Sequence, residues 1–301
     1  MFARLVLIVL VLAGASGAQA GPSCLSPTIT VNVRDSRHNF VPGLQPSSFQ
    51  IHMMDRPLKV ESVKLGTETH RIVLLVDVSG SIGTLHRKWE IARAVAADSL
   101  LNGSPGFKLA LVLFSDHIVE TIGFDRPNSE IAQRLINLQP GKGRTAILDS
   151  LAYAADMLQP ASPGDAVYVV SDGEDNVSRT RMSVVEDKFL RSGIRLFMFI
   201  MKEPFRPTPE EAEFVLPEIT TVTGGEVVEI VMGEVPDPRV VIRNLLSRVY
   251  DEMQHYYLLN LTISQPWPKR ARLHLDVVDD RGKRRKGLAV LYQQFLLSCQ
   301  P

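Results

Sequence analysis

The chain has 301 residues, of which 45% are hydrophobic and 22% are charged, as is typical of a globular protein that is neither disordered nor fibrous. Its 33 basic side chains equal its 33 acidic ones, so no overall field attracts nucleic acid or an anionic membrane. A partner must therefore be recognised by a local site.

The first 20 residues are predicted to be a cleavable signal peptide. Arg4 supplies a positive charge, residues 5–13 form an apolar core too short to span a bilayer, and Ala-Gln-Ala at 18–20 fits a small-residue cleavage site. No later apolar run approaches the roughly 18 residues of a membrane span. We therefore expect a secreted or periplasmic protein without a transmembrane anchor.

Residues 21–68 are expected to form a small β segment. The stretches 28–34 and 49–53 alternate apolar and polar side chains, as half-buried strands do. Residues 58–63 can form a third short strand. Three short strands are not stable alone, so this segment needs another unit to pack on.

From residue 71 the pattern changes, and strands alternate with helices throughout a predicted domain at 69–254. Strands are expected at 71–78, 107–115, 118–124, 165–171, 194–201 and 226–230. Helices are expected at 85–101, 129–137, 146–158, 182–191 and 209–222, followed by a last helix with Asp237 as N-cap and Pro238 at its first position. This order predicts a doubly wound α/β fold, with a mainly parallel six-stranded sheet whose antiparallel edge is the hairpin at 107–124.

The two-residue period returns after residue 254. Residues 257–263 and 271–277 are predicted strands, Asp-Asp-Arg-Gly at 279–282 is a hairpin turn, and 287–297 can return as a final strand. Neither terminal set of strands is self-sufficient. We therefore predict that 255–301 packs with 21–68 as a smaller flanking β module.

Two cysteines, Cys24 and Cys299, lie close to the two ends of the chain. In an oxidising compartment they could form a disulfide that joins the termini. The alternative is a pair of free thiols in the tails, because the sequence does not supply the distance that bonding requires.

Oxygen-bearing side chains follow the most apolar of the predicted strands. Asp77, Ser79 and Ser81 lie at its carboxyl end, where open α/β sheets bind their ligands. Thr145 begins a predicted helix and Asp172 ends another predicted strand, both on the same side of the sheet. Two carboxylates and three hydroxyls suit Mg²⁺ better than zinc, which prefers nitrogen and sulfur.

The DVSGS sequence at 77–81, Thr145 and the SDG sequence at 171–173 resemble the metal-ion-dependent adhesion site of von Willebrand factor A domains at all five positions. The resemblance covers about residues 71–253. It implies that the three hydroxyls touch a divalent metal (Mg²⁺, or Mn²⁺ or Ca²⁺), while the two carboxylates act largely through water. It also implies an open metal position that accepts a carboxylate from a protein partner.

Shorter motifs resemble exported bacterial von Willebrand A-related proteins of the acidobacterial type. These motifs are VPGL at 41–44, TAILD at 145–149 and TGG at 223–225. Proteins of this type flank the A domain with β segments on both sides, as predicted here. The sequence departs from their usual acidic pattern at residues 48–49.

Two alternatives to adhesion-type binding remain open. A haloacid-dehalogenase-like phosphohydrolase also places a nucleophilic aspartate after a buried strand, and Asp77 would take that role. That chemistry needs a carboxylate two residues later as general acid, whereas Ser79 occupies the position. The other alternative is a structural envelope component in which the metal only stabilises the fold. We predict a metal-dependent binding module rather than an enzyme.

Overall fold

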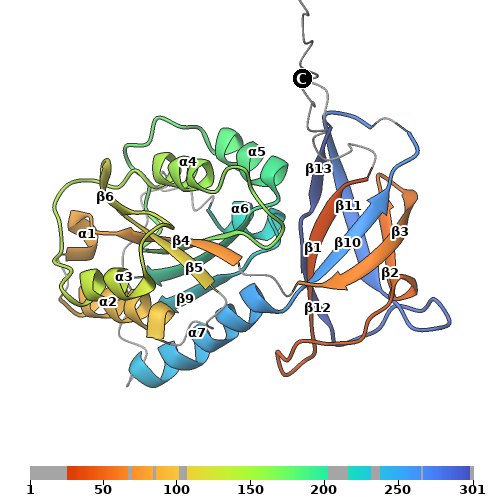
Figure 1. Ribbon diagram of the computed structural model, residues 1–301, viewed down its shortest axis with the longest axis horizontal. Helices are drawn as coiled ribbons and strands as arrows, with labels where there is room; N and C mark the ends of the chain where they lie inside the picture. The colour runs from red at the N-terminus through yellow and green to blue at the C-terminus, as the bar shows by residue number, and fades with distance from the viewer. Residues whose placement is uncertain are drawn as a thin grey trace, which may run out of the picture.

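The computed structural model describes residues 26–66, 70–83, 86–101, 107–202, 216–231, 238–265 and 267–298. These residues form an α/β domain and a β module that lie side by side, and helix α7 leads from the first to the second (Figure 1). This architecture confirms the predicted fold class.

The α/β domain is built on a six-stranded sheet in the order β6-β5-β4-β7-β8-β9. Its strands are β4 (His70–Asp77), β5 (Phe107–Phe114), β6 (Ile118–Ile122), β7 (Ala166–Ser171), β8 (Arg195–Lys202) and β9 (Val227–Val231). Only β6 runs antiparallel, beside β5, as the hairpin prediction expects. The central strand β4 is apolar along nearly its whole length because helices cover both faces of the sheet.

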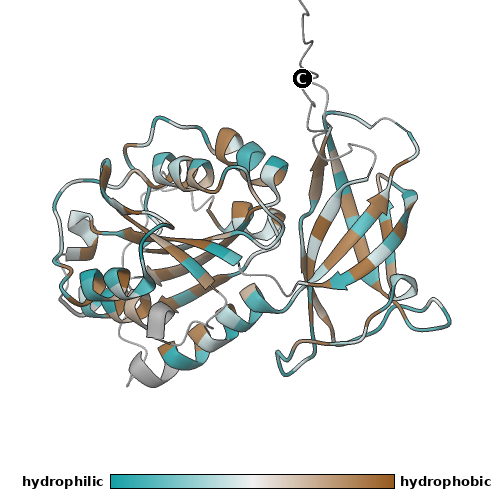
Figure 2. Cartoon of the chain, in the orientation of Figure 1, coloured by the Kyte–Doolittle hydropathy of each residue, from teal (hydrophilic) through white to brown (hydrophobic). Residues whose placement is uncertain are grey.

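Helices form the two outer layers of this domain. They are α1 (Gly80–Gly83), α2 (His86–Leu101), α3 (Asn128–Ile136), α4 (Ile147–Met157), α5 (Met182–Ser192), α6 (Leu216–Val222) and α7 (Pro238–Gln254). One apolar core joins α2, α3 and α7 to the sheet, and a second joins α4, α5 and α6 to its other face (Figure 1). Figure 2 shows hydrophobic residues gathered on the central strands and hydrophilic residues along the outer sides of the helices. The unpredicted α1 is too short to produce a periodic pattern.

The β module unites both ends of the described chain in one seven-stranded antiparallel sheet, ordered β12-β1-β10-β3-β2-β11-β13. Its elements are β1 (Thr28–Arg34), the 3-10 helix η1 (Pro46–Ser48), β2 (Phe49–Met53), β3 (Arg56–Leu65), β10 (Tyr257–Thr262), β11 (Arg270–Val277), β12 (Ala289–Tyr292) and β13 (Phe295–Leu297). The inward residues of early and late strands share a single core. The sheet is therefore complete only when segments from both parts of the chain pair.

The single final strand predicted at 287–297 is wrong, because the chain forms two strands there. β12 pairs with β1 and β13 pairs with β11, on opposite edges of the sheet. Between them Gln293 forms an isolated bridge with Thr223, and the Gln294 amide donates to the Val222 carbonyl at 2.9 Å. Contact with the α/β domain therefore interrupts the strand.

Two glycines after α6 make this contact possible. Gly224 has a φ of +79°, and a Cβ placed on it would lie 2.7 Å from the backbone carbon of Tyr292. A Cβ on Gly225 would lie 1.7 Å from the carbonyl oxygen of Leu196. Only residues without a side chain allow three backbone segments to approach so closely. The TGG motif thus has a structural role where the two bodies meet.

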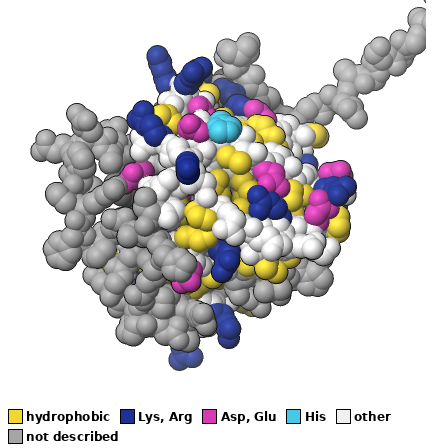
Figure 3. All heavy atoms as spheres, turned by 90° about the vertical axis from the view of Figure 1, so that its left-hand side faces the viewer, with side chains coloured by type: hydrophobic (Ala, Val, Ile, Leu, Met, Phe, Trp, Pro, Cys, Tyr) yellow, Lys and Arg dark blue, Asp and Glu magenta, His cyan; other side chains and the backbone are white. Residues whose placement is uncertain are grey.

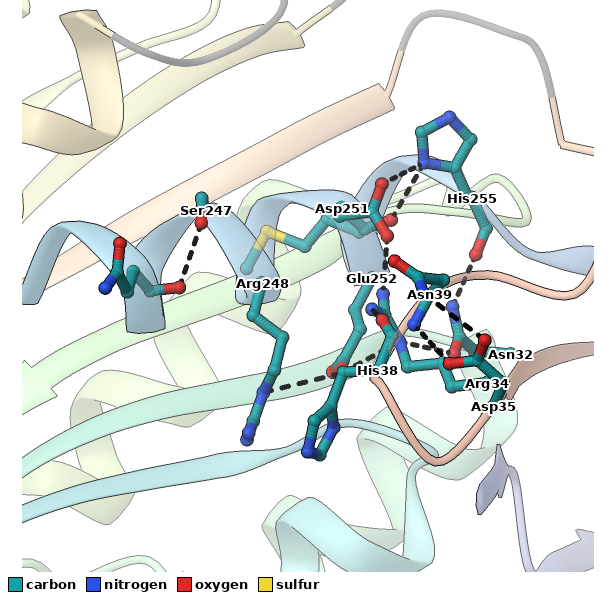
Figure 4. Close-up of polar contacts among 12 residues, drawn as sticks. Asn32, Arg34, Asp35, His38, Asn39, Ser247, Arg248, Asp251, Glu252 and His255 are labelled. Carbon is teal, nitrogen blue, oxygen red and sulfur yellow. Dashed lines mark hydrogen bonds and ion pairs between the residues drawn. The ribbon is translucent and has the colours of Figure 1, made fainter. Parts of the chain in front are cut away.

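Strand β1 is buried on both faces, so the prediction of a half-buried strand is wrong. Its polar residues Asn32 and Arg34 are 3% and 2% exposed because the end of α7 covers them. Arg34 places its Nε 3.0 Å from Glu252 and its Nη2 3.1 Å from Asp251 (Figure 4). These contacts, in which Arg34 and Glu252 are buried and Asp251 is partly exposed, join the β module to the α/β domain.

Several predictions concern residues outside the described part of the chain. These are the signal peptide at 1–20, the Cys24 and Cys299 pair, the Asp237 N-cap and the first part of the helix predicted at 209–222. Within the described residues, no helix combines the length and the apolar character needed to cross a membrane.

Candidate metal centre

Three hydroxyl groups from two loops meet at the carboxyl edge of the sheet. Ser79 and Ser81 follow β4, and Thr145 precedes α4. The Oγ atoms of Ser79 and Ser81 are 3.0 Å apart, and Thr145 donates from its Oγ1 to Ser79 at 3.1 Å. Ser79 and Thr145 are buried. The structure therefore brings three of the five predicted side chains into one contiguous cluster of oxygens.

Glycines allow the two loops to lie backbone against backbone. Gly80 donates its N–H to the Gly143 carbonyl at 3.0 Å, and Gly141 donates to the Val78 carbonyl at 2.8 Å. A Cβ on Gly141 would lie 2.5 Å from that Val78 oxygen, and Gly143 has a φ of +103°. Side chains at these positions would separate the loops and with them the hydroxyls.

Asp77 is completely buried beneath this cluster. Its Oδ1 accepts the Ser79 N–H at 2.8 Å, and its Oδ2 accepts the Ser171 hydroxyl at 2.7 Å. Burial, and next the nearby Asp172 carboxylate, raises the pKa of Asp77 to about 6, although the hydrogen bonds from Ser171 and Ser79 act in the opposite direction. Both carboxylate oxygens are thus engaged in holding the two strand ends together.

Asp172 follows β7 and brings the second carboxylate to the site. Its Oδ2 lies 2.6 Å from Nζ of Lys88, a residue of α2, and both side chains are buried. No sequence pattern singles out Lys88, because a lysine in an amphipathic helix is ordinarily solvated. The structure therefore adds a buried cation to the predicted set of five residues.

Asn176 positions Thr145 and is likewise absent from the predicted site. Its Oδ1 accepts the Thr145 N–H at 2.8 Å, while its own N–H donates to the Thr145 carbonyl at 3.0 Å. Asp149 in α4 accepts backbone N–H groups of Arg179 and Thr180 at 3.1 and 2.8 Å. These bonds tie the loop after β7 to the start of α4, so the third loop supports the other two.

The oxygen set fits a small hard cation. Neighbouring ligands of an octahedral Mg²⁺, each about 2.1 Å from the metal, lie roughly 3 Å apart. The hydroxyl separations of 3.0 and 3.1 Å match that spacing. In the described part of the chain, no group of three or more His, Cys, Asp or Glu side chains gathers where it could hold a metal ion, so the candidate site depends on its hydroxyl oxygens.

The surface around the site carries charges of both signs. Figure 3 shows basic and acidic side chains interspersed on the face that includes α1. Lys142 and Arg144 are exposed in the loop that precedes α4, and Asp116 is exposed beside Gly143. Among the described residues visible on this face, basic and acidic side chains therefore occur together.

An α/β domain with this sheet order and a hydroxyl-carboxylate cluster at its carboxyl edge matches a known family. A family model described as von Willebrand factor type A domain matches residues 72–174, a range that includes all five predicted metal residues. The chain thus contains a von Willebrand factor type A domain, as predicted from its motifs. A comparison with curated protein sequences finds no match.

Solved structures are similar in fold. Proximal thread matrix protein 1 from the mussel byssus, "with zinc occupied MIDAS motif", has 14% identity and a TM-score of 0.52, over 67% of this chain and 50% of that one. A von Willebrand factor type A protein from Catenulispora acidiphila has 12% identity and a TM-score of 0.49, over 91% and 74% of the two chains. BatB from Bacteroides thetaiotaomicron has 15% identity and a TM-score of 0.45, over 60% and 96%.

Proposed function

We propose that this protein is an exported module that binds another protein through a divalent metal ion. The observation that carries the proposal is the buried hydroxyl cluster, whose oxygen separations of 3.0 and 3.1 Å suit adjacent ligands of one small cation. Export rests on the predicted signal peptide at 1–20. The proposed division is a β segment at 21–68, the A domain at 69–254 and a second β segment at 255–301.

Ser79, Ser81 and Thr145 would hold the metal directly, and Asp77 and Asp172 would act largely through water. When bound, Mg²⁺, Mn²⁺ or Ca²⁺ supplies a positive centre that attracts a carboxylate from a partner protein. The zinc in the corresponding motif of the mussel protein supports a divalent metal in this fold. Asp77 braces the site, because its two oxygens hold the Ser79 backbone and the Ser171 side chain.

Phosphoryl transfer is disfavoured by the residue at position 79. Ser79 stands where the general acid would be required, and its hydroxyl contacts two other hydroxyls. We therefore propose a binding role rather than an enzymatic one. Release of phosphate from p-nitrophenyl phosphate, by the wild type or by Ser79→Asp, would argue for the phosphohydrolase.

Calorimetric titration with Mg²⁺ and Mn²⁺ tests the proposed site. Wild-type protein should bind one equivalent, and Asp77→Ala should lose most of that binding because the Ser79 loop and β7 are no longer braced. Asp280→Ala is the matched control, since it removes an exposed carboxylate from the β module. Equal metal affinity in the wild type and in Asp77→Ala would contradict the proposed metal site.

A purely stabilising metal makes a different prediction. Metal would then raise the unfolding temperature without changing affinity for any carboxylate ligand. An adhesion-type site should bind an acidic peptide only when Mg²⁺ is present, and a chelator should release the peptide. A polyglutamate peptide and a polyglutamine peptide of equal length provide the probe and its control.

A further inference from the structure

A buried lysine forms part of the proposed metal site. Lys88 lies in the first turn of α2, and its Nζ is 2.6 Å from Oδ2 of Asp172. The two side chains are 3% and 4% exposed. A buried ammonium group is tolerated only where an opposite charge and hydrogen bonds compensate for lost hydration. This buried contact is therefore a structural part of the site, unlike a solvated ion pair on the surface.

Lys88 changes the net charge of the site both before and after a divalent cation binds. Asp77 and Asp172 contribute two negative charges, and Lys88 cancels one of them. One net negative charge remains before a divalent cation binds, and one net positive charge is present afterwards, because the three hydroxyl ligands are neutral. A site with the two carboxylates alone would become neutral on binding the same cation. Charges in a buried site are weakly screened, so this difference is large.

We propose that Lys88 determines the ligand selectivity of the site. It weakens the binding of the divalent cation and strengthens the binding of a carboxylate to the cation-loaded site. The proposal rests on the function proposed above and specifies its regulation. Because the cation and the carboxylate attract each other directly, the two ligands bind cooperatively, and Lys88 shifts their two affinities in opposite directions. Each must then raise the affinity for the other by the same factor.

The test replaces Lys88 while keeping the volume of its side chain. Lys88→Met removes the charge, and Lys88→Gln removes the charge but keeps a hydrogen-bond donor for Asp172 in case the apolar variant does not fold. Lys142→Met is the matched control, because Lys142 is exposed in the loop that precedes α4. Far-ultraviolet circular dichroism checks folding. Electron paramagnetic resonance of free Mn²⁺ gives the metal affinity. Binding of acetate to protein-bound Mn²⁺ is measured as a decrease in the relaxation rate of water protons.

Both Lys88 variants should bind Mn²⁺ about tenfold more tightly and acetate about tenfold more weakly than the wild type, since one buried unit charge is lost. At one fixed, sub-saturating acetate concentration, acetate should raise Mn²⁺ affinity in the wild type and in Lys142→Met, and less in the Lys88 variants, because they bind acetate more weakly. Folded Lys88 variants that bind Mn²⁺ no more tightly, or acetate no more weakly, than the wild type would overturn the proposal. Failure of the metal site itself would appear separately, as equal Mn²⁺ binding by wild type and Asp77→Ala.

Discussion

Replacing Arg34 by methionine tests whether the two bodies depend on the contacts of this buried arginine, which Figure 4 shows. Arg34 is 2% exposed and contacts Glu252, which is equally buried, at 3.0 Å. Methionine keeps much of the apolar volume but leaves the Glu252 carboxylate with Arg248, whose Nε is 4.0 Å away. Loss of one member of a buried ion pair costs about 3–5 kcal/mol when the other remains charged.

The expected loss depends on pH because Glu252 can take up a proton. Burial, and next the adjoining Glu226 carboxyl, raises the pKa of Glu252 to about 9. Since this value lies above the ordinary 4.5, the stability from protonated Glu252 is complete below pH 4.5 and is lost as the pH rises through about 9. At pH 6, Arg34→Met should therefore lose mainly hydrogen bonds, about 1–2 kcal/mol. At pH 9.5 it should lose about 3 kcal/mol or more.

Urea denaturation followed by circular dichroism at the two pH values measures both losses. Arg284→Met is the matched control in the same module, because Arg284 pairs with Asp276 at 2.9 Å but is 74% exposed. That exposed pair should contribute less than about 1 kcal/mol. Adding Glu252→Gln to Arg34→Met should recover stability at pH 9.5. The reasoning is refuted if Arg34→Met costs no more than Arg284→Met, or if its cost decreases as the pH rises.

Two further predictions concern other contacts. Gly225→Ala should destabilise the protein by about 3 kcal/mol or prevent folding, because its Cβ would overlap the Leu196 carbonyl. The control Gly282→Ala has open space around it and should cost only about 1 kcal/mol of backbone strain. Thermal denaturation compares the stabilities of the two variants. Burial, and next the Arg195 cation, lowers the pKa of His70 to about 4, so unfolding free energy should fall between about pH 6.5 and 4, and a flat profile in that range would contradict the assignment.

The parallel sheet was predictable because its strands are buried on both faces. Near-continuous apolar runs bounded by polar turns mark such strands, and the observed bounds of β5 (Phe107–Phe114) differ by one residue from those predicted. The division of the predicted final strand into two strands was not predictable. The residues around Gln293 form a continuous strand pattern, and a contact with Thr223 of the other body interrupts it.

Some residues of the proposed site could likewise be predicted from the sequence, and others could not. Asp77, Ser79 and Ser81 could be selected because they lie at a strand's carboxyl end, where the α/β topology exposes ligands. Asn176 could not, because its contribution is a pair of hydrogen bonds to the Thr145 backbone. Such supporting contacts leave no periodicity or motif in the chain.

The sequence by itself determined the class of fold and most of its strands and helices, because local periodicity reports how each segment is buried, and the ends of those strands selected the five oxygen-bearing candidates. Only the tertiary structure decided which charges face one another. Lys88 and Asp172 are 84 residues apart, and Arg34 and Glu252 lie in different bodies, so neither pair produces a local pattern. Burial makes these pairs matter, since a charge removed from water must be compensated by whatever the fold places beside it.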